Sequence, residues 1–434
     1  MQNLFRIGLL VTYMAFAFLL KERSSFLLFI TIYAVLFFFY TQVIRKNNDS
    51  LLVNSLWLVL MSFPLFWVNP VLSDDVYRFI WDGRLSISGI NPYKYLPSEI
   101  TNPELTQLFS KLNSPDYYSV YPPLKQVIFA TAAFLSGTSE VTNIFVFRAL
   151  LLLAVVFSGY LIRETIRLSN FNEVGTRNKH LWLLYNPLVL LESVGNLHFE
   201  ILMLTFLLAS YFGYLKWKKI FLPSILFGLA VSVKLIPLML LPLIVMKLGF
   251  RKGVLFVIIA FLLNIVLLLP FLDMATILNF SQSLDLYFHS FEFNASLYYL
   301  IRELGYLFTG FNIINYAGTL LGIISFISIL WLAYSGKHFS LTVVLTLFVH
   351  LIFSTTVHPW YIIPLIGVAA LTPYRFPYLW SMSIGLSYHA YSNLPVQENL
   401  WITLLAYLPV LGLALVEIAN NDNYRPKHLR GLHF

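Results

Sequence analysis

Residues 51–84 read LLVNSLWLVLMSFPLFWVNPVLSDDVYRFIWDGR and join two very different kinds of sequence. Residues 51–68 are almost entirely apolar, whereas residues 73–84 hold three carboxylates and two arginines. An apolar run of this length is typical of a helix that crosses a membrane. Ionised groups are costly inside the hydrocarbon layer, and those found near it usually serve a function. We therefore expect residues 73–84 to lie at a membrane edge.

The composition agrees with a membrane protein. The chain has 434 residues, of which 59% are hydrophobic and 11% charged, and its mean hydropathy is +0.76. Soluble domains carry about 25% charged residues, so this composition excludes one. The net charge of +8 does not indicate nucleic-acid binding, since Lys and Arg of membrane proteins collect in cytoplasmic loops. The absence of cysteine excludes disulfides and thiol chemistry.

Apolar segments predict an all-α polytopic membrane protein with about 12–14 transmembrane helices. The N-terminal segment is interpreted as a first helix and not as a signal peptide, because no small-residue cleavage site follows it. Gly195 with Asn196, and Lys234 with Pro237, interrupt the middle of the series. The predicted segments are residues 4–20, 25–41, 51–71, 142–162, 180–194, 198–215, 219–233, 235–247, 253–271, 314–334, 339–356, 359–372, 377–392 and 399–418.

The basic residues predict the orientation. With the N-terminus inside, most Lys and Arg and few Asp and Glu fall on the inner side, as the positive-inside rule requires. Both termini are then cytoplasmic, and residues 72–141 and 272–313 form two long outer loops. Their many aromatic rings suit helices that lie in the membrane interface, among them residues 122–136. We expect one transmembrane domain over residues 1–434, with a short cytoplasmic tail at 419–434 and no soluble C-terminal domain.

The charged stretch has two interpretations. A helix over residues 73–88, capped by Ser73, would place Asp74, Arg78 and Asp82 on one face. The first interpretation is a solvated helix whose charges form ion pairs along one face. The second is a functional carboxylate at the hydrocarbon boundary, with a raised pKa and a cation nearby.

Other polar residues interrupt apolar sequence at helix junctions. A histidine at such a place is often structural, and a lysine can reach from apolar surroundings to water, but each can also contact a phosphate. No P-loop, GxGxxG or HExxH motif is present, so nucleotide and zinc sites are not indicated. The stretches are GINPYKYLP (89–97), YSVYPPL (118–124), NPLVLLESVGNLHFE (186–200), VSVKLIP (231–237), FNASLYYLIRELG (293–305) and TTVHPWYIIP (355–364).

Taken together and in this order, the stretches resemble the integral-membrane GT-C glycosyltransferases. The likeness is strongest to bacterial mannosyltransferase-like members that use a polyprenyl-phosphate-linked sugar, and it runs from about residue 50 to residue 372. It implies a GT-C fold in which residues 72–141 are the first catalytic loop and Asp74 or Asp75 is the general base. This chain has Asn-Leu-His-Phe-Glu at 196–200, where relatives often show Asn-Gly-His-Asn-Asp. No cofactor is implied for certain, and a divalent metal stays open.

The resemblance also implies the substrates. The expected donor is a polyprenyl-phosphate hexose, with mannose favoured, and the acceptor is a hydroxyl of a glycolipid, glycan or protein. Phosphate is a good leaving group, so one carboxylate suffices as base and cations hold the phosphate. The expected phosphate-binding residues are Arg78, Lys234, Arg302 and His358. The expected substrate contacts are Trp81, Asp82, Tyr93, Asn196, His198, Glu200, Trp360 and Tyr361.

Two other functions stay open at this point. A flippase for lipid-linked glycans would place its polar residues near the bilayer midplane and often show internal repeats, which this chain does not. A glycan ligase or polymerase would need the same outer loops. The resemblance favours transfer with inversion at the sugar, in a bacterial inner membrane, with the site facing the periplasm.

Overall fold

The computed structural model describes residues 2–102, 105–169, 178–393 and 395–421, without the side chains of residues 287–289 and 421. The tail predicted at 419–434 therefore lies mostly outside the described residues. Within them every regular element is a helix, and Phe293 and Thr356 form an isolated bridge. The prediction of an all-α polytopic membrane protein is confirmed.

The helices fall into four consecutive groups. The first is α1 (Gln2–Leu19), α2 (Phe26–Lys46), α3 (Leu51–Ser62) and η1 (Phe63–Trp67). The second is α4 (Asp75–Ile87), η2 (Pro97–Glu99), α5 (Thr106–Phe109), α6 (Pro123–Ser136) and α7 (Glu140–Leu168). The third is α8 (His180–Leu184), α9 (Pro187–Leu190), η4 (Leu191–Gly195), α10 (Glu200–Trp217), α11 (Phe221–Val233), η5 (Ile236–Leu240), α12 (Leu241–Leu248), α13 (Phe250–Leu268) and η6 (Leu269–Phe271). The fourth is α14 (Met274–His289), α15 (Leu297–Thr309), α16 (Ile314–Tyr334), α17 (Phe339–Phe353), η7 (Pro359–Ile362), α18 (Ile363–Ala369), α19 (Phe376–Ser383), η8 (Ile384–Ser392) and α20 (Leu400–Asn421).

Six of the described helices are long and apolar enough to cross a membrane: α1, α2, α7, α13 with η6, α16 and α20. A seventh span would be the pair α9–η4 and α10, which bends by 113° at its break. Other predicted spans are shorter helices, because proline enters the first turn of η5, α12, η7, α18 and α19. Proline fits a first turn but cannot continue a preceding helix. The chain is a multi-pass membrane protein whose spans are partly broken.

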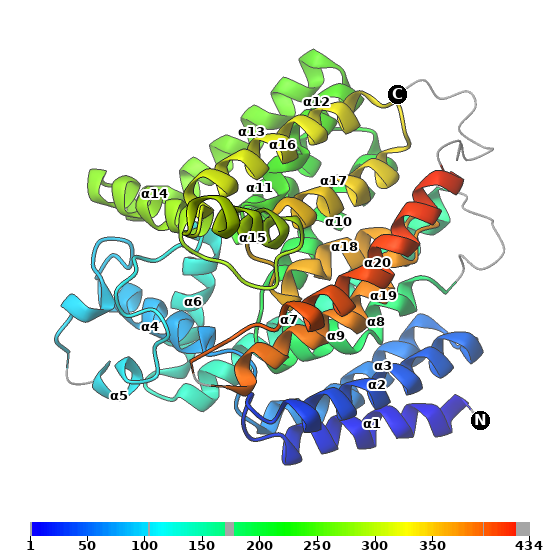
Figure 1. Cartoon of the computed structure of the whole chain (residues 1–434), viewed down its shortest axis with the longest axis horizontal. Coiled ribbons are helices and arrows are strands. Elements are labelled where there is room, and N and C mark those ends of the chain that lie inside the picture. Colours follow the sequence, from blue (N-terminus) through cyan, green and yellow to red (C-terminus); the bar gives the residue numbers. More distant parts are fainter. Residues whose placement is uncertain (1, 103–104, 170–177, 394, 422–434) are drawn as a thin grey trace.

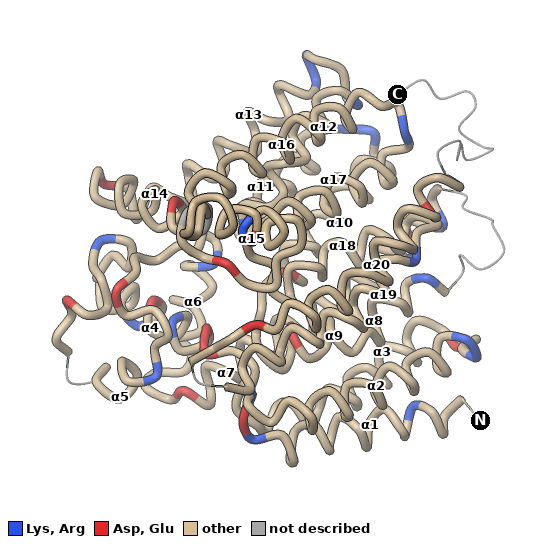
Figure 2. Tube along the Cα trace, viewed as in Figure 1, with Lys and Arg blue, Asp and Glu red and all other residues tan. Residues whose placement is uncertain are grey.

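The charged residues divide along the bundle. Helices α4, α5 and α6 lie at the end of the molecule opposite the start of α1 and the end of α20, with α14 beside them (Figure 1). Lys and Arg predominate at the end where α1 begins and α20 ends, whereas most acidic positions lie near α4–α6 and in the centre (Figure 2). The central acidic positions mark the site described below.

Close packing of α4 on α6 forms one wall of that centre. A side chain at Gly83 would put its Cβ 2.4 Å from the backbone oxygen of Phe129, so the two helices approach as closely as they do only with glycine there. The rings of Phe79 and Phe129 stack at 4.8 Å, and the ring of Phe199 meets both edge-on. These aromatic contacts join α4 and α6 to the start of α10.

The break between η4 and α10 forms the facing wall. Leu197 takes a positive φ of 67° there, a conformation that non-glycine residues rarely adopt. The buried guanidinium of Arg148, on α7, donates to the backbone oxygens of Val194 (2.9 Å) and Gly195 (3.2 Å). Because these carbonyl groups end a helix, Arg148 satisfies acceptors that would otherwise be buried without a partner.

Candidate active site

Asp74 and Asp75 differ in their partners. Helix α4 begins at Asp75, two residues after the predicted start, and the Oγ of Ser73 accepts from the Asp75 N–H at 3.3 Å. Asp74 pairs with Arg23 at 2.9 Å, and the Arg23 guanidinium also lies over the ring of Tyr391. Arg23 comes from the turn between α1 and α2, so the N-terminal hairpin neutralises Asp74.

Asp75 keeps one carboxylate oxygen available. Asn113 donates to its Oδ1 at 2.8 Å, and the described residues give no hydrogen bond to its Oδ2. Burial raises the pKa of Asp75, and the charge of Glu200 adds to this. The hydrogen bond from Asn113 and the positive charges of Lys125 and Lys234 oppose the rise without cancelling it. A carboxylate with a raised pKa and a free oxygen is suited to accept a proton.

Lys125, in the first turn of α6, is the cation that the sequence analysis missed. Its Nζ lies over four aromatic rings, 4.2 Å from the ring centre of Tyr121, 4.8 Å from Phe79, 5.0 Å from Phe199 and 5.6 Å from Phe129. No hydrogen bond or ion pair from the described residues reaches this ammonium group, and burial lowers the pKa of Lys125 to about 7. Its position directly after the YPPL turn was the available signal.

Lys234 and Glu200 form an ion pair across the two helix breaks. Glu200 is the first residue of α10, and Lys234 follows the end of α11 in extended backbone. The Lys234 ammonium lies 4.0 Å from the ring centre of Tyr361. The structure thus brings together the predicted contacts Lys234, Glu200 and Tyr361. The charges of Lys234 and Glu200 also act on Asp75.

Four aromatic rings form a continuous column beside this pair. The ring of His198 stacks on Trp360 at 3.5 Å, Trp360 on His358 at 4.5 Å, and His358 on Phe293 at 4.9 Å. Buried nitrogens of His198 (Nε2) and His358 (Nδ1) have no hydrogen-bond partner among the described residues. Burial and the charge of Lys234 lower the pKa of His358 to about 3. His358 is therefore neutral at physiological pH and could meet a phosphate only through a neutral hydrogen bond.

Asn196 connects the helix break to the start of the α4–α6 segment. Its Oδ1 accepts from the buried N–H of Leu72 at 3.1 Å, three residues before Asp75. Its Nδ2 donates to Glu192 at 3.4 Å, and Glu192 also accepts from the Tyr388 hydroxyl at 2.5 Å. The geometry gives Asn196 a role in positioning the segment that carries Asp75.

Arg78 and Asp82 form an ion pair with each other. Their buried ion pair is 2.8 Å long, and Asp82 also accepts from Ser119 at 2.5 Å and from Gln126 at 3.0 Å. Arg78 also donates to the backbone oxygen of Tyr117 at 2.8 Å. Of the two i,i+4 ion pairs that the sequence allows for Arg78, the structure forms the pair with Asp82 and not the pair with Asp74. The network fastens the loop before α6 to α4.

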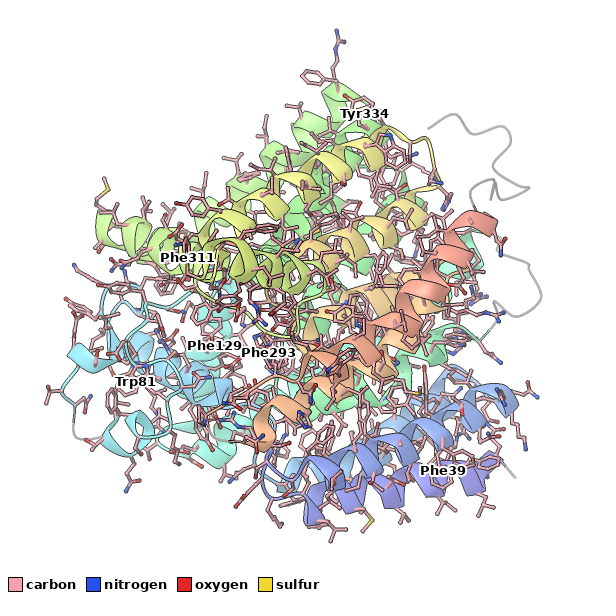
Figure 3. The ribbon with its side chains drawn as sticks, in the orientation of Figure 1. Phe39, Trp81, Phe129, Phe293, Phe311 and Tyr334 are labelled. Atoms are coloured by element: carbon pink, nitrogen blue, oxygen red, sulfur yellow. The ribbon has the colours of Figure 1, made fainter. Side chains whose placement is uncertain are left out.

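Three other predicted residues lie in separate surroundings. Trp81 is buried against Phe109 and lies away from the central Phe129 and Phe293 (Figure 3). The hydroxyl of Tyr93 donates to the backbone oxygen of Tyr121. Arg302 pairs with two glutamates, at 2.8 and 2.9 Å. The structure gives these residues protein partners and does not test whether they also meet a substrate.

An apolar cavity of about 290 Å³ is lined in part by residues that are close to the two lysines in sequence. Pro122 and Pro123 in its wall directly precede the turn that bears Lys125, and Leu235 directly follows Lys234. The remaining lining residues come mainly from α11, η5, α13 and α14. Among the described residues, no three His, Asp or Glu side chains gather closely enough to hold a metal ion.

The fold and site define a multi-pass membrane protein with a buried charged centre at one end of its bundle. The sequence profile of the family "Alpha-(1->6)-mannopyranosyltransferase, N-terminal domain" matches residues 9–249, more than half of the chain. The chain belongs to this family, which confirms the resemblance to bacterial mannosyltransferases. The matched region includes Asp74, Asp75, Lys125, Glu200 and Lys234.

Two curated relatives are similar over part of their length. "Alpha-(1->6)-mannopyranosyltransferase B" of Corynebacterium glutamicum is 28% identical over 151 residues, 34% of this chain and 24% of that protein. A protein of Mycolicibacterium smegmatis with the name "Probable alpha-(1->6)-mannopyranosyltransferase" is 30% identical over 176 residues, 39% of this chain and 30% of that protein. The matched part of the chain spans less than a third of either relative. No solved structure matches the chain significantly.

Proposed function

We propose that the protein transfers mannose from a polyprenyl-phosphate-linked donor to an acceptor hydroxyl. The observation that carries this proposal is the Asp75 carboxylate, which keeps one oxygen free and on which Lys125, Lys234 and Glu200 act electrostatically. The names of the relatives support mannose and an α-(1→6) linkage.

The chemistry follows from the groups present. The acceptor oxygen attacks the anomeric carbon, the bond from that carbon to the phosphate oxygen breaks, and the phosphate leaves as an anion. Asp75 takes the proton of the acceptor hydroxyl, which is general-base catalysis. Lys125 and Lys234 stabilise the leaving phosphate by charge, so that no general acid is needed. A single direct displacement inverts the anomeric centre.

Asp75 is preferred to Asp74 as the base because of their partners. The Arg23 guanidinium pairs with Asp74 at 2.9 Å, and no contact in the described residues links Asp74 to the two lysines. Asp75 has a raised pKa and a free oxygen and is influenced by both lysines. A base with a pKa closer to the operating pH transfers protons more effectively.

The surroundings suit a lipid-linked donor. The apolar cavity can take the first part of a prenyl chain, and its wall includes Pro123 and Leu235, which are close in sequence to Lys125 and Lys234. The excess of basic residues at the end where α1 begins and α20 ends supports cytoplasmic termini under the positive-inside rule (Figure 2). The site then faces the periplasm of a bacterial inner membrane, and residues 72–141 and 272–313 form its outer loops.

The test is mannosyl transfer by the purified protein in lipid nanodiscs. Radiolabelled decaprenyl-phosphate mannose, glucose and arabinose are offered with octyl α-mannoside as acceptor. The proposal is supported if only the mannose donor reacts and if an exo-α-mannosidase releases the labelled mannose from the product. If no monophosphate donor reacts while a diphosphate-linked oligosaccharide is transferred, the proposed mannosyl transfer is refuted in favour of a glycan ligase.

A further inference from the structure

A polar cavity of about 370 Å³ lies where the loop after α4 meets the end of α13. Its volume is within the range of sites that hold small molecules. It is distinct from the apolar cavity, because the two share none of their lining residues. The lining consists of residues 89–91, 94, 95 and 270–273.

The walls of this cavity are fastened in place. Asn91 donates to the backbone oxygen of Phe271 at 2.8 Å, and Asn279 donates to the backbone oxygen of Tyr93 at 3.0 Å. The ring of Tyr93 also packs edge-on against the ring of Phe271. Tyr93 lines the apolar cavity and Phe271 the polar one, so the walls of the two cavities meet at this ring contact.

Three side chains of the lining remain accessible. Lys94 and Asp273 are paired at 3.5 Å and are 45% and 39% exposed. The ring of Tyr95 is 42% exposed. Asp273 uses its Oδ1 to cap α14 through Thr276, so its Oδ2 is left for Lys94 and for a ligand.

This combination suits a neutral sugar. The paired charges sum to zero, which favours neither an anion nor a cation, but they offer both donors and an acceptor to hydroxyl groups. An exposed aromatic ring beside them can pack against the apolar face of a pyranose. We infer that the cavity holds a sugar of the acceptor glycan beyond the one that receives mannose, an assignment that rests on the proposed function.

The experiment compares acceptors of different length. Octyl glycosides of one to four α-(1→6)-linked mannose units are offered with a saturating donor to the full chain in nanodiscs. The wild type is expected to have a lower KM for the tetramannoside than for the monomannoside. In Tyr95→Ala, the ratio of the KM for the monomannoside to the KM for the tetramannoside is expected to fall about tenfold. Asp273→Asn should reduce it too, and it keeps the helix cap because Asn and Asp cap equally well.

Tyr316→Ala is the matched control. Tyr316 is also an exposed tyrosine, but it lies on α16 outside both cavities. This variant should keep the length preference of the wild type. An equal KM for all acceptors in the wild type, or an unchanged preference in both Tyr95→Ala and Asp273→Asn, would overturn the inference.

A binding measurement separates this inference from the proposed function. Saturation-transfer NMR with α-(1→6)-mannotetraose needs no turnover. If the wild type transfers no mannose, the proposed function fails, and a tetraose signal that Tyr95→Ala abolishes would still support the sugar site. If the wild type gives no saturation-transfer signal with the tetraose, the inferred sugar site is refuted, whether or not the protein transfers mannose.

Discussion

The sharpest prediction contrasts two neighbouring carboxylates. Asp75→Asn removes the proposed base but keeps an oxygen that can accept from Asn113. General-base help contributes about 10²–10⁴-fold, so kcat should fall by that factor, which corresponds to about 3–5 kcal/mol of activation free energy. Asp74→Asn removes an ion pair whose two side chains are each 37% exposed. Such pairs contribute about 0.2–1 kcal/mol, so kcat should change by less than about fivefold.

The assay is initial-rate transfer from radiolabelled decaprenyl-phosphate mannose, with the melting temperature of each variant as the folding control. The pH profile gives a second readout. Because burial raises the pKa of Asp75, kcat/KM of the wild type should fall as the pH drops through a value above the ordinary aspartate pKa. Loss of turnover in folded Asp74→Asn with turnover kept in Asp75→Asn would refute the reasoning. Turnover kept in both would leave Glu200 as the next candidate for the base.

Three further predictions follow from the buried partners. Lys125, whose pKa burial lowers to about 7, should lose its charge as the pH rises through that value, so kcat/KM for the donor should fall there. Lys125→Met should remove this pH dependence and lower kcat/KM by about 10–100-fold, and a wild-type profile in this variant would contradict its role. Arg78→Met leaves Asp82 buried without its partner and should cost about 3–5 kcal/mol, seen as a lower melting temperature. An unchanged melting temperature with a raised donor KM would return Arg78 to phosphate binding. Asn196→Ala leaves the Leu72 N–H buried and unpaired, which should destabilise the protein by about 1–3 kcal/mol in the same measurement, whereas equal stability would exclude this positioning role.

Local sequence predicted the helix that follows the first charges. The spacing of charges over residues 73–84 indicated a helix, and α4 is found at Asp75–Ile87. It could not predict which charges pair. Arg78 can reach Asp74 or Asp82 equally well along a helix, and the choice is made by Ser119 and Gln126, which come from outside α4 and bind Asp82.

Lys125 was missed for a related reason. Along the chain it is a single lysine in an apolar segment, which usually means a side chain that reaches to water. Its role depends on rings from α4, from the YPPL turn and from the residue before α10, which only the tertiary packing brings together. The neutralisation of Asp74 by Arg23 is equally invisible in the sequence, because the two residues lie in different helix connections.

The sequence alone determined that this protein is helical, lies in a membrane and belongs among the mannosyltransferase-like proteins. Hydrophobic length and charge depletion decide the first two properties, and they can be counted along the chain. The resemblance to the family rests on the polar stretches between residues 73 and 364. The tertiary structure decided which carboxylate keeps a free oxygen, which charged groups act on it and which residues line the two cavities. Those properties depend on burial and on distances between residues far apart in sequence, because the cost of an unpaired charge is set by its surroundings and not by its neighbours in the chain.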